Sequence, residues 1–446
     1  MPDQTRREFS REANQRLDSL RLDPGPSSYR QMAKRKLLVL SHVLPFPGNS
    51  GQQQRVSYTL QAARKQFHVT FATAVAPGDR QDVRDRLLTL CDDVLLLPSQ
   101  YPQHQIGRAW HKAVGGSYSA SKGLKYSNYV IGQLEFAPAR VASLLNGSSF
   151  DCALFEYWHA ARSTSVFRER GIPCLLDMHN ILWQARERDL NTTGFLPGIW
   201  NRRALRKYKE QEEQAWQNFD GLITINSEEH KYVENSVATG PRLFYAPMGT
   251  DLGLWPYSWQ PVSPPRIAYY GALSTQHNQR DALRCYEKIM PIVWSHFPDA
   301  ELWLVGSKPP EFLRRLTSDP RVKVTGFVED VQSLLATMAL VLCPWVGTYG
   351  FRSRLIEVMA LGVPLVTCPD AVYGMDLEHG KGLFLGADDE ELAGHVLSLI
   401  RDPKLAREQS RLARQSVEER YSVGSTYERL MCEVAEWLRS RERKIA

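Results

Sequence analysis

Short runs of consecutive apolar residues recur along the first part of the chain, and segments able to form helices separate them. The runs cover 36–41, 68–73, 94–98, 152–157, 173–178 and 221–226. A short apolar run bounded by turn residues is typical of a strand that is buried on both faces. Buried strands that alternate with helices predict a parallel sheet with helices on both sides.

The same pattern begins again after a proline-rich break, with apolar runs at 266–271, 300–306, 321–325, 340–344 and 364–368. We therefore predict an α/β protein with two doubly wound, Rossmann-like domains and an interdomain cleft where ligands bind. The predicted parts are a flexible polar and basic tail at 1–35, a first domain at 36–257, a linker at 258–265, a second domain at 266–424, and a C-terminal helix at 425–446 that packs back on the first domain.

Composition agrees with a two-domain globular protein. A chain of 446 residues is too long for one ordinary core, and 43% of its residues are apolar while 23% are charged. Its seven cysteines are scattered without paired spacing and mostly lie in apolar runs, which predicts reduced core residues and neither a disulfide framework nor a zinc site. The net charge of +6 suits anionic ligands. We expect no nucleic-acid partner.

Location can also be predicted from composition. The longest apolar stretch, 334–346, contains Thr337 and Pro344 and is too short to span a bilayer. The first residues lack the apolar core and cleavage site of a secretory signal. We therefore expect a cytoplasmic protein.

The strongest local signal lies at 347–366, where an apolar strand ends in a glycine-containing loop and a helix begins near Arg352. Arg352 and Arg354 then lie at a helix N-terminus, where guanidinium groups, free N–H groups and the helix dipole all favour a phosphate. Glu357 follows one turn later on the same face, where its carboxylate can accept two hydrogen bonds from the diol of a ribose. The alternative is an exposed Arg–Glu pair of the ordinary kind.

Two further strand ends carry weaker signals. The loop at 45–55 contains Gly48 and Gly51 and leads into a helix whose N-terminus offers free N–H groups, although an ordinary strand-to-helix turn explains it equally well. Asp177, His179 and Asn180 end another apolar strand, which is a good place for a catalytic imidazole. A hydrogen-bonded structural histidine is the alternative.

Four segments in a fixed order carry a resemblance to a known family: RIAYYGALSTQHNQRDAL, AELWLVG, VTGFVEDV and FRSRLIEVMALGVPLVTCPDAVYG. Together they resemble retaining nucleotide-sugar glycosyltransferases of family 4, with GT-B architecture, and in particular a bacterial branch that builds exopolysaccharides. The resemblance covers about residues 36 to 440. It implies transfer of a sugar from a nucleoside-diphosphate sugar to a glycan, lipid-linked or small-molecule acceptor.

The resemblance also implies roles for single residues of the second domain. In that family, the residues that match Arg352 and Arg354 bind the donor diphosphate, and the residue that matches Glu357 binds the ribose. The backbone at positions matching Gly271 and Ala272 lines the phosphates. Phe327 and Val328 match the loop beside the nucleobase.

In the first domain, the resemblance makes His179 the catalytic residue that points at the donor sugar, and Gly51 part of a loop against the donor. Two positions depart from the family pattern. Many members have Glu eight residues before Glu357, contacting the donor sugar, where this chain has Tyr349. The Arg and Lys found after the first strand of the second domain are missing, which leaves Asn278 and Arg280.

The resemblance implies neither a metal nor a cofactor, because helix dipoles and arginines can stabilise the departing nucleoside diphosphate. The acidic pairs Asp92–Asp93 and Asp388–Asp389 precede a strand and a helix, and neither is typical of a metal site. Two other functions stay open: a non-hydrolysing sugar-nucleotide epimerase and an inactive donor-binding partner subunit. A dinucleotide dehydrogenase is disfavoured, since no GxGxxG follows the first strand.

Two stretches of the first domain, 101–131 and 186–210, match the region where the family binds acceptors. The second contains a basic segment with Trp200, Leu205 and Tyr208 that suits peripheral contact with an anionic membrane carrying a lipid-linked acceptor. A solvated helix face is the alternative interpretation.

Overall fold

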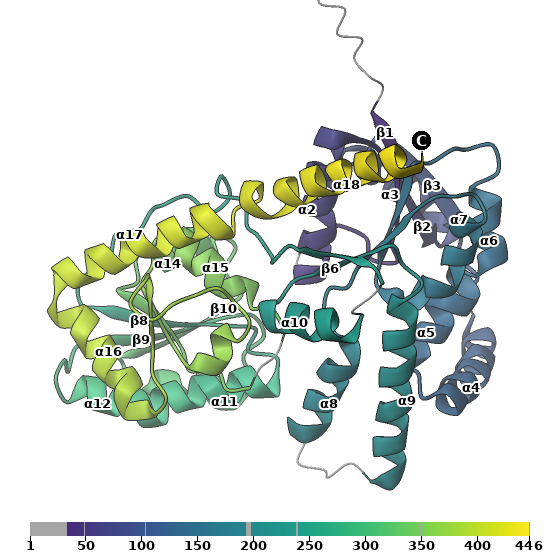
Figure 1. Cartoon of the computed structure of the whole chain (residues 1–446). Helices are drawn as coiled ribbons and strands as arrows, with labels where there is room; N and C mark the ends of the chain where they lie inside the picture. Colours follow the sequence, from purple (N-terminus) through teal and green to yellow (C-terminus); the bar gives the residue numbers. More distant parts are fainter. Residues whose placement is uncertain are drawn as a thin grey trace, which may run out of the picture. The chain divides into compact units, whose positions relative to one another are not determined.

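The computed structural model describes residues 34–48, 50–102, 104–192, 198–237, 240–347 and 350–445. Tyr349 lies outside these ranges, as does the predicted tail up to residue 33. The described residues form an α/β fold with one seven-stranded and one six-stranded sheet, in which all the strand pairs are parallel, so the predicted fold class is confirmed (Figure 1).

The first sheet has the order β3-β2-β1-β4-β5-β6-β7. The order reverses between β1 and β4, and ligands of doubly wound sheets bind at the carboxyl ends of strands at such a point. The strands are β1 (Arg35–Leu40), β2 (Phe67–Val75), β3 (Asp93–Pro98), β4 (Cys152–Glu156), β5 (Cys174–Asp177), β6 (Gly221–Thr224) and β7 (Arg242–Tyr245).

The second sheet has the order β10-β9-β8-β11-β12-β13, and its reversal lies between β8 and β11. Its strands are β8 (Arg266–Tyr270), β9 (Glu301–Val305), β10 (Val322–Gly326), β11 (Leu340–Cys343), β12 (Leu365–Thr367) and β13 (Leu383–Leu385). The apolar runs did not predict β7 and β13. Both are edge strands of four and three residues, and both are only partly buried, so neither carries a long apolar run.

Helices connect the strands and cover the sheets (Figure 1). Those of the first sheet are α2 (Gly51–Gln66), α3 (Arg80–Leu88), α4 (Gln105–Lys122), α5 (Tyr126–Tyr129), α6 (Pro138–Leu144), α7 (Thr164–Arg168), α8 (Leu182–Thr192), α9 (Ile199–Trp216) and α10 (Ser227–Ser236). Those after β8 are α11 (Gln276–Arg284), α12 (Met290–Trp294), α13 (Glu311–Arg314), α14 (Val331–Ala336), α15 (Ser353–Ala360), α16 (Asp389–Arg401), α17 (Pro403–Arg420) and α18 (Arg429–Ile445).

Both faces of the first sheet are buried, as a parallel sheet requires. Alternate residues of β1 enter two different cores: Leu38 and Leu40 pack on one side, and Leu37 and Val39 on the other. The last helix, α18, belongs to the second of these cores through Leu430, Met431 and Val434, and it also contacts α2. The helix α18 therefore completes one of the two cores of the first sheet.

Six of the seven cysteines are buried and all are free thiols, as predicted for reduced core residues. Only Cys432 is exposed. Among the described helices, none has the length and apolarity needed to cross a bilayer.

Candidate active site

The reversal point of the second sheet carries the segment that gave the strongest sequence signal. After β11, the chain turns through Gly347 and Gly350, whose φ angles of 91° and 49° are left-handed and favour glycine. The helix α15 then begins at Ser353 with Arg352 as its N-cap residue. Arg352 and Arg354 therefore lie at the N-terminus of this helix, the position that we inferred for them from the sequence.

The two arginines are held by aromatic rings. The Arg352 guanidinium lies over the Trp345 ring at 4.7 Å and donates a 2.8 Å hydrogen bond to the Gly347 carbonyl. The Arg354 guanidinium lies over the Tyr270 ring at 5.4 Å. Contacts of this kind fix a long, flexible side chain in advance of binding.

Glu357 is buried, and burial raises the pKa of its carboxyl while Arg354 and a hydrogen bond from Gln54 act in the opposite direction. Gln54 belongs to α2, which follows the first sheet's β1. The carboxylate thus lies where elements of both sheets meet.

A cavity of about 450 Å³ joins these residues. From the second sheet it is lined by Trp345, Arg352, Arg354, Glu357 and Asn278, among others, and from the first by Ser50, Gly51, Gln54 and Met248. The N-termini of α2 and α15 both open into it, because α2 begins at Gly51 and α15 at Ser353. Four predicted site residues, Gly51, Arg352, Arg354 and Glu357, therefore line one cavity. Two guanidinium groups and two helix N-termini make it suitable for a dianion.

Gly271 and Ala272 follow β8 at the same reversal point. The Ala272 carbonyl accepts a 2.9 Å hydrogen bond from the Asn278 side chain, whose oxygen accepts one from Tyr269 at 3.1 Å. A Cβ at Gly271 would lie 3.0 Å from the Tyr269 ring, so packing alone favours glycine there. Asn278 is thus a buried support for this turn, and Arg280 is exposed on α11.

Phe327 and Val328 follow β10. The Phe327 side chain is 80% exposed, while Val328 packs partly against the core of the second sheet. Neither is among the residues that line the 450 Å³ cavity. The structure therefore does not bring these two residues together with Arg354 and Glu357 in that cavity.

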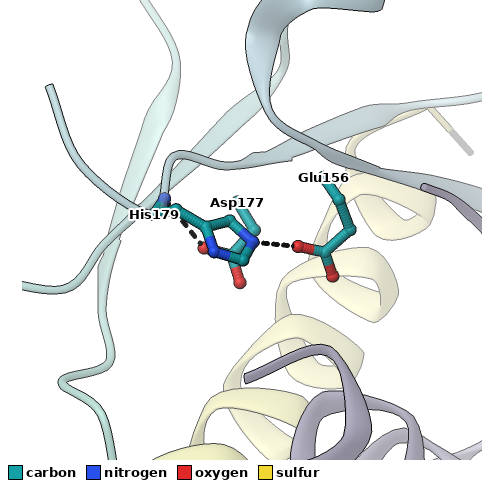
Figure 2. A group of neighbouring side chains, drawn as sticks. All are labelled: Glu156, Asp177 and His179. Carbon is teal, nitrogen blue, oxygen red and sulfur yellow. Dashed lines mark hydrogen bonds and ion pairs between the residues drawn. The ribbon is translucent and has the colours of Figure 1, made fainter. Parts of the chain in front are cut away.

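Next to the reversal point of the first sheet, Glu156 at the end of β4 forms a buried group with Asp177 and His179 at the end of β5 (Figure 2). The imidazole Nε2 makes a short hydrogen bond with Glu156 Oε2, and the His179 backbone N–H donates to Asp177. Burial, and then the charge of Asp177, raise the pKa of Glu156. The charge of His179 and its hydrogen bond to Glu156 act in the opposite direction on the pKa of Glu156.

Arg55 balances part of this buried charge. It comes from α2, is fully buried, and its Nε lies 2.9 and 2.8 Å from the two Asp177 oxygens, while Nη1 donates to the Ala246 carbonyl at 3.0 Å. Glu156, Asp177 and His179 are close enough to share a metal ion. The Arg55 cation already faces both Asp177 oxygens, so the chain itself offsets the charge of Asp177. That the protein uses no metal stays a prediction.

The backbone is strained where this group forms. Among the described residues, only three besides glycine have positive φ, and Tyr157 at 72° and His179 at 57° are two of them. They follow the neighbouring strands β4 and β5, and their rings stack with centroids 4.2 Å apart at 14°. Strain of about 1–3 kcal/mol at each such residue persists only where the surroundings impose it, and it clusters at functional sites.

Two more histidines lie beside Tyr157. The His42 ring, which follows β1, lies 5.3 Å from the Tyr157 ring and 5.7 Å from that of His159. Burial first, and then the neighbouring His179, lower the pKa of His42 to about 4. Burial, then His42 and then Lys125, lower that of His159 to about 3. Both imidazoles are neutral near pH 7.

Several polar atoms of this region are buried without a hydrogen-bond partner in the described part of the chain. They are His42 Nδ1, His159 Nδ1, the Tyr157 hydroxyl, Glu156 Oε1 and Asn180 Oδ1. A Cβ built on Gly350 would lie 2.9 Å from Asn180 Oδ1, so this end of β5 touches the loop that leads into α15. Buried polar groups without partners are rare, and a bound ligand is one way to satisfy them.

Sequence reasoning did not single out Arg55, Glu156, His42 or His159. Glu156 could have been noticed in the sequence, because a carboxylate inside an otherwise apolar strand needs a partner. Arg55 comes 122 residues before the aspartate with which it pairs, and no spacing rule predicts such a contact.

Comparison with known proteins agrees with this architecture. Residues 264–402 match the family model described as glycosyl transferases group 1. The matched segment begins just before β8 and ends with α16, so the cavity residues Asn278, Arg352, Arg354 and Glu357 all lie within it. The predicted resemblance to GT-B glycosyltransferases of the family 4 kind is confirmed.

A curated relative, the N-acetyl-alpha-D-glucosaminyl L-malate synthase of Bacillus anthracis, is 28% identical over 165 residues. The match takes in 35% of this chain and 42% of that protein, so the chain spans less than half the length of this relative.

Solved structures share the fold across nearly the whole chain, including the elements before the matched segment. Sucrose-phosphate synthase from Thermosynechococcus elongatus has a TM-score of 0.59 at 15% identity, covering 92% of this chain and 100% of that one. HepE of Anabaena, in complex with UDP and glucose, has a TM-score of 0.54 at 17% identity, covering 91% and 100%. A TarM mutant of S. aureus, in complex with Fondaparinux, alpha-GlcNAc-glycerol and UDP, has a TM-score of 0.57 at 12% identity, covering 91% and 99%.

Proposed function

We propose that the protein is a glycosyltransferase that moves a sugar from a nucleoside-diphosphate sugar to a glycan, lipid-linked or small-molecule acceptor. The transfer retains the anomeric configuration and needs neither a metal nor a cofactor. One observation carries the proposal: Arg352, Arg354 and Glu357 line a single cavity with the N-termini of α2 and α15.

The charge of the cavity suits a diphosphate leaving group. As the bond between sugar and phosphate breaks, negative charge grows on the diphosphate, and fixed cations and helix N-termini stabilise that charge without reorganising. Arg352 and Arg354 are held over aromatic rings before any ligand binds. Glu357 follows them on the same helix and accepts hydrogen bonds from the ribose hydroxyls.

The group around His179 serves the transferring sugar and the acceptor. Asn180 contacts the loop before α15, so the strand end that carries His179 lies beside the donor cavity. The neutral imidazoles of His42 and His159 and the Tyr157 hydroxyl have unpaired polar atoms that can orient an acceptor hydroxyl. Phe327 offers an exposed ring against which a nucleobase can stack.

UDP is the nucleotide to test first, because it is present in the HepE and TarM complexes. Titration calorimetry should show binding of UDP, and Arg354→Ala and Arg352→Ala should each weaken it by about 1.5–3 kcal/mol through loss of a charge-assisted contact. Arg280→Ala is the matched control, because Arg280 is exposed on α11 and does not line the cavity. Unchanged affinity in both cavity variants, for every nucleoside diphosphate tried, would remove the proposed donor site.

Turnover decides between a transferase and the two other functions. Nucleotide release that depends on an acceptor indicates transfer, conversion of the nucleotide sugar to its epimer without net nucleotide release indicates an epimerase, and binding without either reaction indicates an inactive partner. Turnover should persist in EDTA. Its loss, with recovery on adding Mg²⁺ or Mn²⁺, would contradict the metal-free mechanism.

A further inference from the structure

The helix α4 turns its large apolar residues toward solvent. Ile106, Trp110 and Val114 are 83%, 68% and 39% exposed, and they recur every four residues, so they form one row along the helix. The residues between them on the same side, Ala109, Ala113 and Ser117, are exposed as well. We call this row, with Ile106, Trp110 and Val114 as its large members, the apolar face of α4.

The opposite side of α4 packs with small residues. Gly115 and Ser119 are buried there, and a Cβ at Gly115 would lie 2.3 Å from the Tyr129 ring and 2.6 Å from the Tyr126 ring. An ordinary surface helix buries its apolar stripe and exposes its polar one. In α4 the arrangement is reversed, since glycine and serine face the protein while tryptophan and isoleucine face outward. An exposed contiguous apolar row of this kind marks an interaction surface.

The charge along α4 and its flanking residues has one sign. No Asp or Glu occurs from Val94 to Leu134, while this stretch contains Arg108, Lys112, Lys122 and Lys125. The neighbouring helix α9 adds a second basic segment, in which Arg202, Arg203 and Arg206 are exposed, and Arg206 lies 3.9 Å from Glu210 of the same helix. The two helices lie side by side (Figure 1). The Lys207 ammonium donates a 3.2 Å hydrogen bond to the Ser121 carbonyl.

We propose that the apolar face of α4 lies on an anionic membrane, with Trp110 and its two neighbours in the headgroup region and the lysines and arginines of α4 and α9 facing acidic lipids. Apolar residues on one helical face beside basic residues are what such surfaces bind. A second copy of the chain fits less well, because in a twofold contact the basic residues of α4 would face themselves. Membrane docking does not depend on the proposed function. The further consequence, that the acceptor is lipid-linked, does depend on it.

Vesicle flotation of the full chain tests this surface. The protein should float with vesicles of phosphatidylcholine and phosphatidylglycerol and should bind vesicles of phosphatidylcholine alone much less. The double variant Ile106→Ser, Trp110→Ala should lower partitioning by about tenfold or more, since it removes the large apolar anchors. Lys112→Glu should weaken binding to the anionic vesicles and should leave the weak binding to neutral vesicles almost unchanged.

The double variant Leu254→Ser, Phe312→Ala is the matched control, because both side chains are exposed apolar residues away from α4, at 59% and 44% exposure. It should bind vesicles as the unaltered protein does. Failure of the unaltered protein to bind anionic vesicles would overturn the proposal, as would equal binding by the α4 variant. Light scattering that shows a dimer, broken by the α4 variant, would overturn it in favour of self-association.

The same proteins separate docking from sugar transfer. The α4 variant should keep the melting temperature and the UDP affinity of the unaltered protein, because the apolar face is exposed and does not line the donor cavity. If no nucleotide binds while vesicle binding follows the expected pattern, the membrane surface stands and the proposed function fails.

Discussion

The two reversal points of the sheets hold their charged residues in different ways. At the second sheet, Arg352, Arg354 and Glu357 come from six consecutive residues, and the arginines are only partly buried beside an open cavity. At the first sheet, Arg55, Glu156, Asp177 and His179 come from three different parts of the chain and are buried. The first arrangement resembles a binding surface and the second a core. Removing a residue should therefore cost affinity at the cavity and stability at the buried group.

The largest effect should come from Asp177→Ala. This variant leaves the Arg55 cation buried without its carboxylate, which costs about 3–5 kcal/mol of unfolding free energy. Chemical denaturation measures this. Replacing both partners, Arg55→Met with Asp177→Leu, should recover much of the loss. Glu428→Ala, which breaks the exposed pair with Lys65, should cost about 1 kcal/mol or less. Equal losses in Asp177→Ala and Glu428→Ala would contradict a buried ion pair that depends on both members.

His179→Ala comes next and tests whether the buried group also takes part in the reaction. We expect the turnover number to fall by about 10²-fold, or about 2.7 kcal/mol, while UDP affinity stays nearly intact, the pattern of a group that acts mainly in the transition state. Some stability should also be lost, because the hydrogen bond to Glu156 and the stacking on Tyr157 disappear.

His179→Phe separates the two contributions, because it keeps a ring against Tyr157 and removes the nitrogen atoms. Turnover per folded molecule should fall in this variant as far as in His179→Ala. A destabilised variant with normal turnover per folded molecule would make His179 a structural residue.

The same contrast explains what could be predicted from the sequence. The strands of both sheets were predicted from apolar runs, except for the short edge strands β7 and β13. The start of α15 was also predicted, because a local stretch contains the strand, the glycines and the arginines together. The buried group was not, since Arg55 meets Asp177 only once β1, β5 and α2 are assembled. His179 was predicted only as a histidine at the end of a strand. Its contact with Glu156 and its left-handed backbone could not be predicted, because they depend on the neighbouring strand.

A smaller effect is expected from pH at the edge of the buried group. The pKa of His159 is lowered to about 3, so the folded protein binds fewer protons here than the unfolded chain, whose histidine titrates near its ordinary 6.5. The stability that the neutral imidazole contributes is therefore present above pH 6.5 and is lost as pH falls toward 3. Each pH unit in this window corresponds to about 1.4 kcal/mol, so the loss from His159 alone should reach about 2 kcal/mol near pH 5.

His159→Phe should remove this part of the acid sensitivity, because a phenyl ring can still stack on Trp158 and takes up no proton. His296→Gln is the control for the loss of a histidine side chain, since His296 is exposed. Glu156 acts in the other direction, because its raised pKa favours the folded state as it takes up a proton. The difference between variant and unaltered protein is thus the quantity to compare. A constant difference between pH 7 and 5 would show that His159 protonates freely in the folded state.

The smallest effect should come from Glu357→Gln, which changes the hydrogen bonding of the cavity and leaves its shape. The amide keeps one acceptor oxygen and introduces an NH₂ donor, so a ribose diol should lose about 1 kcal/mol of binding, a factor of about five in the Michaelis constant for the donor. Burial already raises the pKa of this carboxyl, so the fold should tolerate a neutral residue there and the melting temperature should not fall. The decisive measurement compares UDP with 2′-deoxy-UDP on both proteins. If Glu357 binds the ribose, the unaltered protein prefers UDP and the variant loses that preference, because only the ribonucleotide has the second hydroxyl. If the variant loses the same affinity for both nucleotides, Glu357 acts by holding Arg354 and Gln54 in place, and the two arginines alone define the donor site.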